Sequence, residues 1–448
     1  MDRTFMCIDL KSFFASCECI DRGLDPFTTP LVVASTTQGQ GALTLAITPC
    51  LKKQGIKSRG RLYEIPKGVE YMIVDPRMKL YQQKSKEVIS IYLDFVDFKD
   101  LHVYSIDECF LDVTSYSKYY GKTDVELAEE ILKKVEQDTG LTANCGIGPN
   151  MLLAKIAMDT EAKKFKNGIA KWTMDDVPTK LWEISPLSDM WGIGPAMQKK
   201  LNNLGMYKVG DIANHDKDDL TKRFGVMGTE LWRSANGLDE SVISDMKVPP
   251  KEKSFSHSQM LHKDYFKANI GILIEEMVEV VCARLRASNY DCQLIGFGLG
   301  YNKYVTGGFY HSQKLDAPTR DPKVILKVCN TMLENYYDGS AIRKIMISVG
   351  KLSTNESHQL NLFSDYEKEV KDEKLNHSID MVKMKFGKNS LVKASALLND
   401  STIMERNEKI GGHHAWVKKA KIVVWWNGIR FTLLCLKLRL EVLLIKKL

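Results

Sequence analysis

Long apolar runs are missing from this sequence of 448 residues. No stretch reaches the roughly 18 apolar residues that a membrane-spanning helix needs, so the sequence predicts no membrane segment. Ten cysteines are present, but no Cys-x-x-Cys pair occurs among them, which argues against a structural zinc site. A secretory signal is missing too, because Met1-Asp2-Arg3 leads directly into a strand. We therefore expect a cytoplasmic protein with reduced thiols.

Most of the chain also lacks an excess of charge of one sign. The net charge of +7 comes from residues 412–448, which hold eight Lys or Arg and one Glu, and the rest of the chain holds 55 basic and 55 acidic residues. A nucleic-acid surface must then be a local basic face that acids balance elsewhere. The composition is that of a globular protein, and the length suggests about two to four domains.

Three acidic residues are present in two apolar segments that lie far apart in the sequence. Asp9 follows Phe5-Met6-Cys7-Ile8, and Asp107 and Glu108 follow Tyr104-Ser105-Ile106. Two carboxylates about 4 Å apart repel each other by about 4 kcal/mol at the effective dielectric of a protein cleft, so three of them in one site need cations. Ligation by oxygen alone is typical of Mg²⁺, and two such ions assist an in-line phosphoryl displacement. The residues thus indicate nucleotidyl transfer.

The same three residues also allow a simpler interpretation. Side chains alternate between the two faces of a strand, so Asp107 and Glu108 share a site only if the chain bends between them. Without that bend, Asp9 merely ends a strand and the acidic pair belongs to a solvated hairpin.

The residues around the acids resemble the Y-family of translesion DNA polymerases, in particular its UmuC-like Gram-positive branch (UmuC/ImpB/MucB/SamB type). Asp-x-x-x-Phe-Phe-Ala-Ser-Cys-Glu at residues 9–18 and Ser-Ile-Asp-Glu at residues 105–108 match two palm motifs of that family. The likeness runs from residue 2 to about residue 411. It implies a multidomain α+β fold, that of a right-hand polymerase. The expected parts are a palm (1–25 and 69–171), small fingers (26–68), a helix-hairpin-helix thumb (172–246), a linker (247–253), a βαββαβ little finger (254–355) and a C-terminal extension (356–412). An atypical tail (413–448) follows them.

The resemblance also assigns roles at the acidic site. Asp9 and Asp107 would share two Mg²⁺ ions, Glu108 would hold the ion that activates the primer 3′-hydroxyl, and the backbone carbonyl of Leu10 would complete the nucleotide-bound ion. Phe14 stands where the family has its steric gate, an aromatic ring that fills the volume a ribose 2′-hydroxyl needs. Phe13 would lie beside it in the pocket for the incoming dNTP.

Basic residues near the expected fingers would hold the triphosphate. Lys52 matches a family Arg or Lys that contacts phosphate, although a run of charges is more often a solvated face. Pro49 stands where many members have a phosphate-binding Tyr, a departure that weakens that contact. A further lysine for the γ-phosphate is Lys163 or Lys164, and the long segment before Gly168 leaves the choice between them open.

Two segments are expected to contact the primer-template DNA. Trp191-Gly192-Ile193-Gly194-Pro195 resembles the thumb's helix-hairpin-helix, in which Gly192 and Gly194 let backbone N–H groups approach phosphates. Further along, the hydrophobic periodicity alone predicts the order βαββαβ, with strands at 254–261, 292–301, 306–314 and 342–352 and helices at 269–288 and 321–337. On its exposed face we expect phosphate contacts from Lys303, Tyr304, His311 and Lys314.

A short motif follows that module. Gln359-Leu360-Asn361-Leu362-Phe363 resembles the bacterial clamp-binding peptide, with Gln359, Leu360, Leu362 and Phe363 as the residues that would bind the β sliding clamp. An ordinary connection between elements is the alternative. After residue 412 the sequence loses stable periodicity, and we interpret residues 413–448 as a frame-shifted or otherwise atypical terminus without a catalytic role.

These observations together predict an error-prone, template-directed polymerase that inserts deoxynucleotides opposite damaged bases in an SOS-type response, as a cytoplasmic, nucleoid-associated protein. A UmuD-like or recombinase activator stays open. Two alternatives remain. A DNA-bound and clamp-bound accessory protein would not need the acids, and a palm-type nucleotidyl cyclase would not need a primer or the thumb and little-finger modules.

Overall fold

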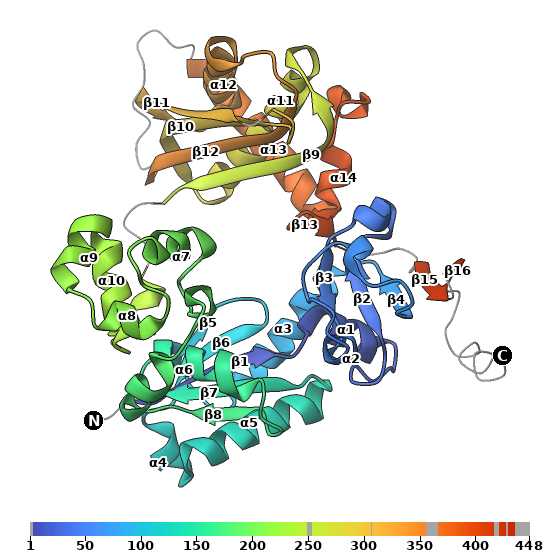
Figure 1. The fold of residues 1–448 in the computed structure, drawn as a ribbon. Coiled ribbons are helices and arrows are strands. Elements are labelled where there is room, and N and C mark those ends of the chain that lie inside the picture. The colour runs from blue at the N-terminus through green and yellow to red at the C-terminus, as the bar shows by residue number, and fades with distance from the viewer. Residues whose placement is uncertain are drawn as a thin grey trace. The chain divides into compact units, whose positions relative to one another are not determined.

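The structure, a computed structural model, describes residues 3–248, 253–305, 307–354, 366–415, 421–426 and 429–434, with the backbone alone for 366–370, 414 and the last two ranges. The chain divides into two compact units (Figure 1). The N-terminal unit consists of Met1–Val248 with His413–Leu448, and the C-terminal unit consists of Pro249–Gly412.

The N-terminal unit is built on a five-stranded central sheet in the order β5-β6-β1-β7-β8. Strand β1 lies in its middle and pairs antiparallel with both β6 and β7, whereas β7 and β8 are parallel. The strands are β1 (Phe5–Leu10), β5 (Leu101–Val103), β6 (Glu108–Asp112), β7 (Ala143–Gly148) and β8 (Ile169–Lys171). The two flanking strands bring segments that are remote in sequence to the end of β1 where Asp9 lies.

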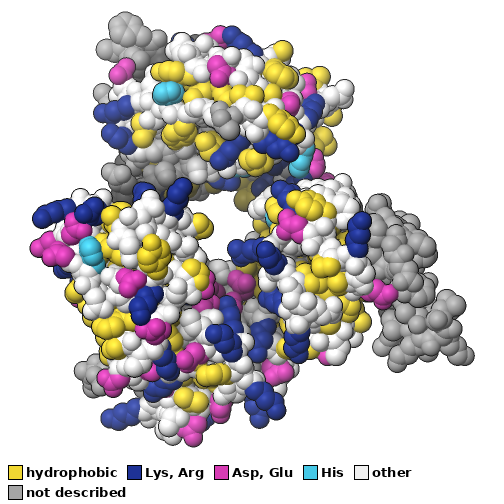
Figure 2. Space-filling view, viewed as in Figure 1, with side chains coloured by type: hydrophobic (Ala, Val, Ile, Leu, Met, Phe, Trp, Pro, Cys, Tyr) yellow, Lys and Arg dark blue, Asp and Glu magenta, His cyan; other side chains and the backbone are white. Residues whose placement is uncertain are grey.

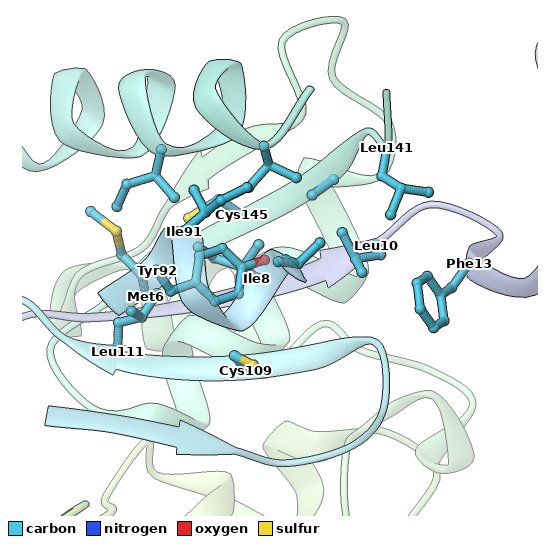
Figure 3. Close-up of a cluster of buried hydrophobic side chains, with 14 of the residues drawn as sticks. Met6, Ile8, Leu10, Phe13, Ile91, Tyr92, Cys109, Leu111, Leu141 and Cys145 are labelled. Carbon is cyan, nitrogen blue, oxygen red and sulfur yellow. The ribbon is translucent and has the colours of Figure 1, made fainter. Parts of the chain in front are cut away.

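Both faces of the central sheet are covered. Met6, Ile8 and Leu10 of β1 are buried together with Ile91 and Tyr92 of a helix (Figure 3). The helices that contribute buried residues to this cluster are α1 (Phe13–Asp21), α3 (Met78–Leu93) and α5 (Asp124–Thr139), and the short α4 (Tyr116–Tyr120) precedes α5. The alternate residues of β1, Phe5 and Cys7, are buried on the opposite face against α6 (Met151–Ala157).

A second five-stranded sheet, called the small sheet because β2, β3 and β4 have only four residues each, has the strand order β16-β15-β4-β2-β3. Its strands are β2 (Leu31–Ala34), β3 (Thr44–Ile47), β4 (Tyr71–Val74), β15 (Lys421–Trp426) and β16 (Ile429–Leu434), and the helices α1 (Phe13–Asp21) and α2 (Pro49–Lys53) accompany it. Because β4 pairs with β2, the small sheet continues past residue 68, the boundary that the sequence suggested for the fingers. Part of the terminal tail, as β15, pairs with β4.

A module of short helices follows β8 in the N-terminal unit. It contains α7 (Pro195–Asn202), α8 (Val209–Ala213), α9 (Lys217–Phe224) and α10 (Val226–Ala235). Its core packs Trp172 and Leu181 against residues of α6 such as Leu153, so the module and the central sheet share α6.

The C-terminal unit has the predicted element order. It comprises β9 (Phe255–Tyr265), α11 (Lys267–Ala287), β10 (Tyr290–Tyr301), β11 (Gly308–Thr319), α12 (Pro322–Tyr336) and β12 (Ile342–Thr354). The strands form one sheet in the order β11-β10-β12-β9. The buried residues of α11 and α12 pack on one face of it. Strand β11 extends five residues beyond Lys314, the predicted end.

The C-terminal extension is folded and docks on this unit. It contains α13 (Tyr366–Phe386) and α14 (Ile403–Asn407), and the two-residue strands β13 (Lys409–Ile410) and β14 (His413–His414) follow. Arg286 of α11 makes a two-pronged contact with Asp380 at 2.6 and 3.0 Å. The buried Glu276 accepts a hydrogen bond from Ser401 at 2.5 Å. Polar contacts of this kind, rather than an apolar stripe, hold the extension in place.

Basic and acidic side chains lie next to each other on the face of the protein seen in Figure 2. No charge of one sign covers that face, in agreement with the balanced counts in the sequence. None of the helices in the part of the chain that the structure describes has the length and apolar character of a membrane span. Every cysteine within the described residues is a free thiol.

Candidate active site

Two of the three candidate carboxylates lie opposite each other on neighbouring strands. Asp9 of β1 and Glu108 of β6 are direct partners in the antiparallel register, and side chains of such partners lie on the same face. Cys7, two residues before Asp9, is on that face as well, and its Sγ donates to Glu108 Oε1 at 3.1 Å. Glu108 is buried, whereas the Asp9 side chain is 19% exposed.

The third carboxylate lies in a bend just before β6. The Leu10 N–H donates to the Asp107 carbonyl at 2.9 Å, and the N–H groups of Tyr104 and Ser105 both donate to the Glu108 carbonyl at 3.0 Å. The Asp107 side chain accepts from Ser105 Oγ at 2.6 Å. The chain therefore bends at residues 105–107, so Asp107 lies in the bend and Glu108 is the first residue of the strand.

Two lysines are paired with these acids. Lys163 Nζ lies 3.2 Å from Asp9 Oδ2, and Lys155 Nζ lies 2.7 Å from Glu108 Oε1. The pKa of Asp9 is raised, first by burial and then by the negative charges of Asp107 and Glu108, and the positive charge of Lys163 opposes the shift. The three acids thus act on one another electrostatically, as a cation site requires.

The donor chemistry fits a hard divalent ion. All three acids offer carboxylate oxygens, and Leu10, the last residue of β1, lies beside Asp9. As the side chains stand, no three His, Cys, Asp or Glu residues within the described ranges are grouped closely enough to enclose a metal. Asp9 and Glu108 instead direct oxygens toward ammonium groups.

The ring of Phe14 has a fixed support. It stacks on Tyr81 of α3, with ring centroids 4.5 Å apart and planes 16° from parallel. The Tyr81 hydroxyl donates at 2.7 Å to Glu18, a fully buried carboxylate that Arg77 also holds with bonds of 2.7–3.1 Å. Phe14 is half-buried, whereas Phe13 is 2% exposed and belongs to the core. The Phe13 ring is therefore part of the buried core next to Phe14, and it does not line an open pocket.

The corner between β1 and α1 is conformationally unusual. Ser12 has φ 50° and ψ 41°, the left-handed region that residues other than glycine rarely adopt. Its hydroxyl is buried and has no hydrogen-bond partner within the described residues. Backbone strain of this kind is concentrated at functional sites, and here it sets the direction in which Phe13 and Phe14 leave the strand.

Lys52 and Lys163 lie near the acids, from different elements. The pKa of Lys52, in α2, is lowered by reduced hydration and by the charge of Lys163, whereas the charges of Asp9 and Asp107 raise it. Lys163 follows a π-helical turn, Met158–Ala162. That turn accommodates the long segment before Gly168 and places Lys163, rather than Lys164, at Asp9.

The glycine loop of the helical module contacts the acidic hairpin. Trp191 Nε1 donates to the Tyr104 hydroxyl at 3.4 Å. Gly192 has φ +92°, and a Cβ at Gly192 or Gly194 would meet no atom within 4 Å. The predicted phosphate-approach loop is therefore open, and α7 begins directly after it.

The predicted DNA contacts of the C-terminal unit lie on different faces. Tyr304 is 83% exposed in the turn between β10 and β11, with Lys303 Nζ 5.0 Å from its ring centroid. Lys314 stands opposite Leu294 in the strand register. Its side chain lies on the open face of the sheet, the face on which Tyr310 covers Gly296. His311 stacks at 3.8 Å on Tyr336 of α12. It therefore lies on the helix side, not on the open face where the sequence suggested it.

The predicted clamp-binding residues Gln359, Leu360, Leu362 and Phe363 lie outside the described residues.

Two glycines of β7 let α6 lie directly on the sheet. A Cβ at Gly146 would come within 2.0 Å of the Ala154 carbonyl oxygen and 2.4 Å of the Met158 nitrogen, and one at Gly148 within 2.6 Å of the Ala154 nitrogen. All of these are backbone atoms, which cannot rotate away. Since α6 carries Lys155, this contact determines how near the lysine comes to Glu108.

Gly146→Ala should accordingly destabilise the N-terminal unit by at least about 3 kcal/mol, the upper part of the usual range for overpacking. Urea denaturation followed by circular dichroism measures this change. Gly41→Ala is the matched control, because a Cβ at Gly41 would meet no atom within 4 Å. An unfolding midpoint in Gly146→Ala equal to that of the control would contradict the packing argument.

Sequence reasoning missed the residues that support the site. Tyr81 was not singled out, and Glu18 was identified only as the last residue of the motif at residues 9–18. Lys155 and Asp159 were not identified at all, although the spacing of Lys155, Asp159 and Lys163 at four-residue intervals is a signal for charges along one helix face.

Comparisons with known proteins agree with this arrangement. A sequence model of the impB/mucB/samB family matches residues 8–159, its HHH motif matches residues 175–206, and its C-terminal domain matches residues 252–362. The "Putative UV-damage repair protein UvrX" of Bacillus subtilis (strain 168) is 38% identical over 416 residues, which cover 92% of this chain and 97% of the relative. "DNA polymerase IV 2" of the same organism is 32% identical over 419 residues, which cover 92% of this chain and 99% of the relative.

Among solved structures, a "Y-family DNA polymerase chimera Dbh-Dpo4(243-245)-Dbh" superposes with a TM-score of 0.62 at 22% identity. The match covers 79% of this chain and 100% of the chimera. At this level of identity the likeness concerns the fold, which is that of a multidomain right-hand polymerase.

Proposed function

This chain belongs to the impB/mucB/samB family, and from that membership we propose that Asp9, Asp107 and Glu108 are the residues with which it extends a DNA primer. The protein is a translesion DNA polymerase of DNA repair, and its relatives carry the names of a UV-damage repair protein and of DNA polymerase IV. The observation that supports the assignment of the acids is the register of β1 and β6, which makes Asp9 and Glu108 direct partners, together with the bend before β6 that contains Asp107.

Polymerases of this family depend on a metal, and we assign two Mg²⁺ ions to this site. Asp9, Asp107, Glu108 and the Leu10 carbonyl would hold them. The ions would supply positive charge against the phosphates and favour deprotonation of the primer 3′-hydroxyl. Asp9 would then have to give up its contact with Lys163, and the Lys163 ammonium group would be available to the nucleotide.

Side chains of the small sheet and of the turn after α6 would bind the dNTP. Lys163 and Lys52 lie near the acids, and both would contact the triphosphate. Phe14, held against Tyr81, would occupy the space of a ribose 2′-hydroxyl. Lys164 is the weaker candidate, because the π-helical turn gives the Asp9 contact to Lys163.

We assign the modules of a right-hand polymerase accordingly. The central sheet would be the palm, residues 26–74 with β2, β3 and β4 of the small sheet the fingers, the helical module the thumb and the sheet of the C-terminal unit the little finger. Gly192 and Gly194 would approach template phosphates, and Lys303, Tyr304 and Lys314 would contact the duplex. His311, stacked on Tyr336, is better placed to shape the edge strand than to bind phosphate.

Activity is tested by primer extension opposite a template abasic site, with and without Mg²⁺. We expect extension of the primer in the presence of the ion and none after its removal. Primer-independent consumption of a nucleotide would instead favour a cyclase.

We further propose that the segment with Gln359 and Phe363 binds the β sliding clamp, which would raise the local concentration of a weakly bound polymerase. Replacing Gln359, Leu362 and Phe363 together by alanine should leave distributive synthesis unchanged and remove stimulation by the clamp. Stimulation that persists in the triple variant, measured by product length with and without clamp, would refute the tether. A UmuD-like or recombinase activator is a further partner that this family membership suggests.

A further inference from the structure

A continuous row of alternating charges connects Asp9 to Glu108. From Asp9 the row runs through Lys163, Asp159 and Lys155 to Glu108, with successive N···O distances of 3.2, 2.7, 3.0 and 2.7 Å. Asp159 lies in the middle of the row and contacts both lysines, one with each carboxylate oxygen. Nothing in the reaction described above requires Asp159, yet among the described residues it is the one group in an ion pair with both lysines.

The backbone around Asp159 is shaped for this double contact. Lys155 lies in α6, whereas Asp159 lies in the π-helical turn Met158–Ala162 and Lys163 follows it. In a regular α-helix, residues spaced by four drift round the axis, and a π-turn with its wider winding reduces that drift. Lys155, Asp159 and Lys163 therefore stay on one face, the face toward the acids.

Lys163 has two carboxylate partners at unequal distances. It lies closer to Asp159, at 2.7 Å, than to Asp9, at 3.2 Å. A lysine side chain is long and flexible, and fixing it costs conformational entropy. When cations and a triphosphate enter, Asp9 must give up Lys163. Asp159, on the same turn, can keep the ammonium group in position throughout.

On the basis of the proposed function, we propose that Asp159 is a positioning residue for the incoming nucleotide: it holds Lys163 ready for the triphosphate during the exchange at Asp9 and, through Lys155, fixes Glu108. Asp159 does not touch the reacting atoms. Its effect is that the dNTP meets a lysine that is already ordered, so less entropy is lost on binding.

The test measures the dissociation constant of a dNTP from the full-length protein bound to a primer with a 3′-dideoxy end, in the presence of Ca²⁺, by fluorescence of a 2-aminopurine in the template. No chemistry occurs in this complex. We expect Asp159→Asn to raise the constant by about tenfold, the weight of one charge-assisted hydrogen bond. Asp159→Glu should restore most of the loss.

The matched control is Asp138→Asn. Asp138 makes the same kind of contact, a pair with Lys134 four residues earlier at 2.7 Å, on the exposed side of α5. The Asp138→Asn replacement should leave the dissociation constant of the dNTP unchanged. The proposal would be overturned if the dissociation constant of the dNTP in Asp159→Asn lay within twofold of the parent value. It would also be overturned if Asp138→Asn weakened dNTP binding as much as Asp159→Asn does.

A double variant shows whether Asp159 acts through Lys163. Lys163→Gln alone should weaken dNTP binding, and adding Asp159→Asn should weaken it little further, because the lysine to be positioned is already absent. If the factors by which the two replacements raise the dissociation constant multiply in the double variant, Asp159 acts independently of Lys163 and the proposal is wrong. If the asparagine variant does not fold, Asp159→Ser is judged by the same values, since the Asp159 side chain is 32% exposed and tolerates a small polar replacement.

Failure of this inference differs from failure of the proposed function. If the parent protein binds no dNTP in the ternary complex, the assigned activity is wrong. If the parent binds dNTP and Asp159→Asn binds it equally well, the activity stands and only the positioning role is wrong.

Discussion

Asp107→Ala should reduce primer extension by about 10³-fold or more. Removing one carboxylate from a site that binds cations forfeits several kcal/mol of transition-state stabilisation, and each 1.36 kcal/mol corresponds to a factor of ten in rate. Asp107 is half-exposed in its bend, and within the described part of the chain its side chain accepts a hydrogen bond from Ser105 alone, so the variant should fold normally. Single-turnover incorporation of one dNTP measures the loss.

Asp112→Asn provides the control for this experiment. Asp112 ends the same strand, β6, but pairs with Arg3 and caps Thr114 at the far end from the site. Its replacement should change the rate little. If Asp107→Ala and the parent restore damage tolerance equally in cells, the protein acts as a DNA-bound accessory protein and not through its acids.

Phe14→Ala should lower the preference for dNTPs over rNTPs by about 10- to 200-fold, the range that small steric differences in a pocket produce. The space vacated by the ring should stay empty, because Tyr81 behind it is held by Glu18 and Glu18 by Arg77. The ribose 2′-hydroxyl then meets no obstacle. The ratio of incorporation efficiencies for one dNTP and its rNTP gives the answer.

Phe14→Tyr, which keeps the aromatic ring, serves as the comparison and should preserve the preference for deoxynucleotides. An unchanged ratio in Phe14→Ala would remove Phe14 from the role of a steric gate. A reduced ratio in both variants would point to the stack with Tyr81 rather than to the volume of the ring.

The sequence predicted the elements of the C-terminal sheet, and it singled out the three acids for a different reason. The elements of the C-terminal unit are long and strongly periodic, from α11 with 21 residues to β12 with 13, and such patterns are the most readable. The acids were found through the residues around them. Strands β2, β3 and β4 have four residues each in a segment rich in turns, too short for a period to emerge.

What the sequence could not predict depends on contacts between remote segments. The choice between Lys163 and Lys164 follows from one π-helical turn, which no spacing rule reveals. The docking of the C-terminal extension rests on side chains such as Asp380 and Glu276, which look like ordinary surface charges until their partners are known. Likewise, His311 belongs to the helix side because its partner in the register is the buried Phe297. Lys314, three residues later, lies on the other face, since successive side chains on a strand alternate.

The contact between α6 and Gly146 has a mechanical consequence. Backbone presses on backbone there, so the helix cannot slide or tilt without the sheet. The acids of β1 and β6 and the lysine that faces Glu108 therefore move as one rigid block. A damaged template base of unusual shape must be accommodated by the parts around this block, and the spacing of the reacting charges stays constant from one lesion to the next.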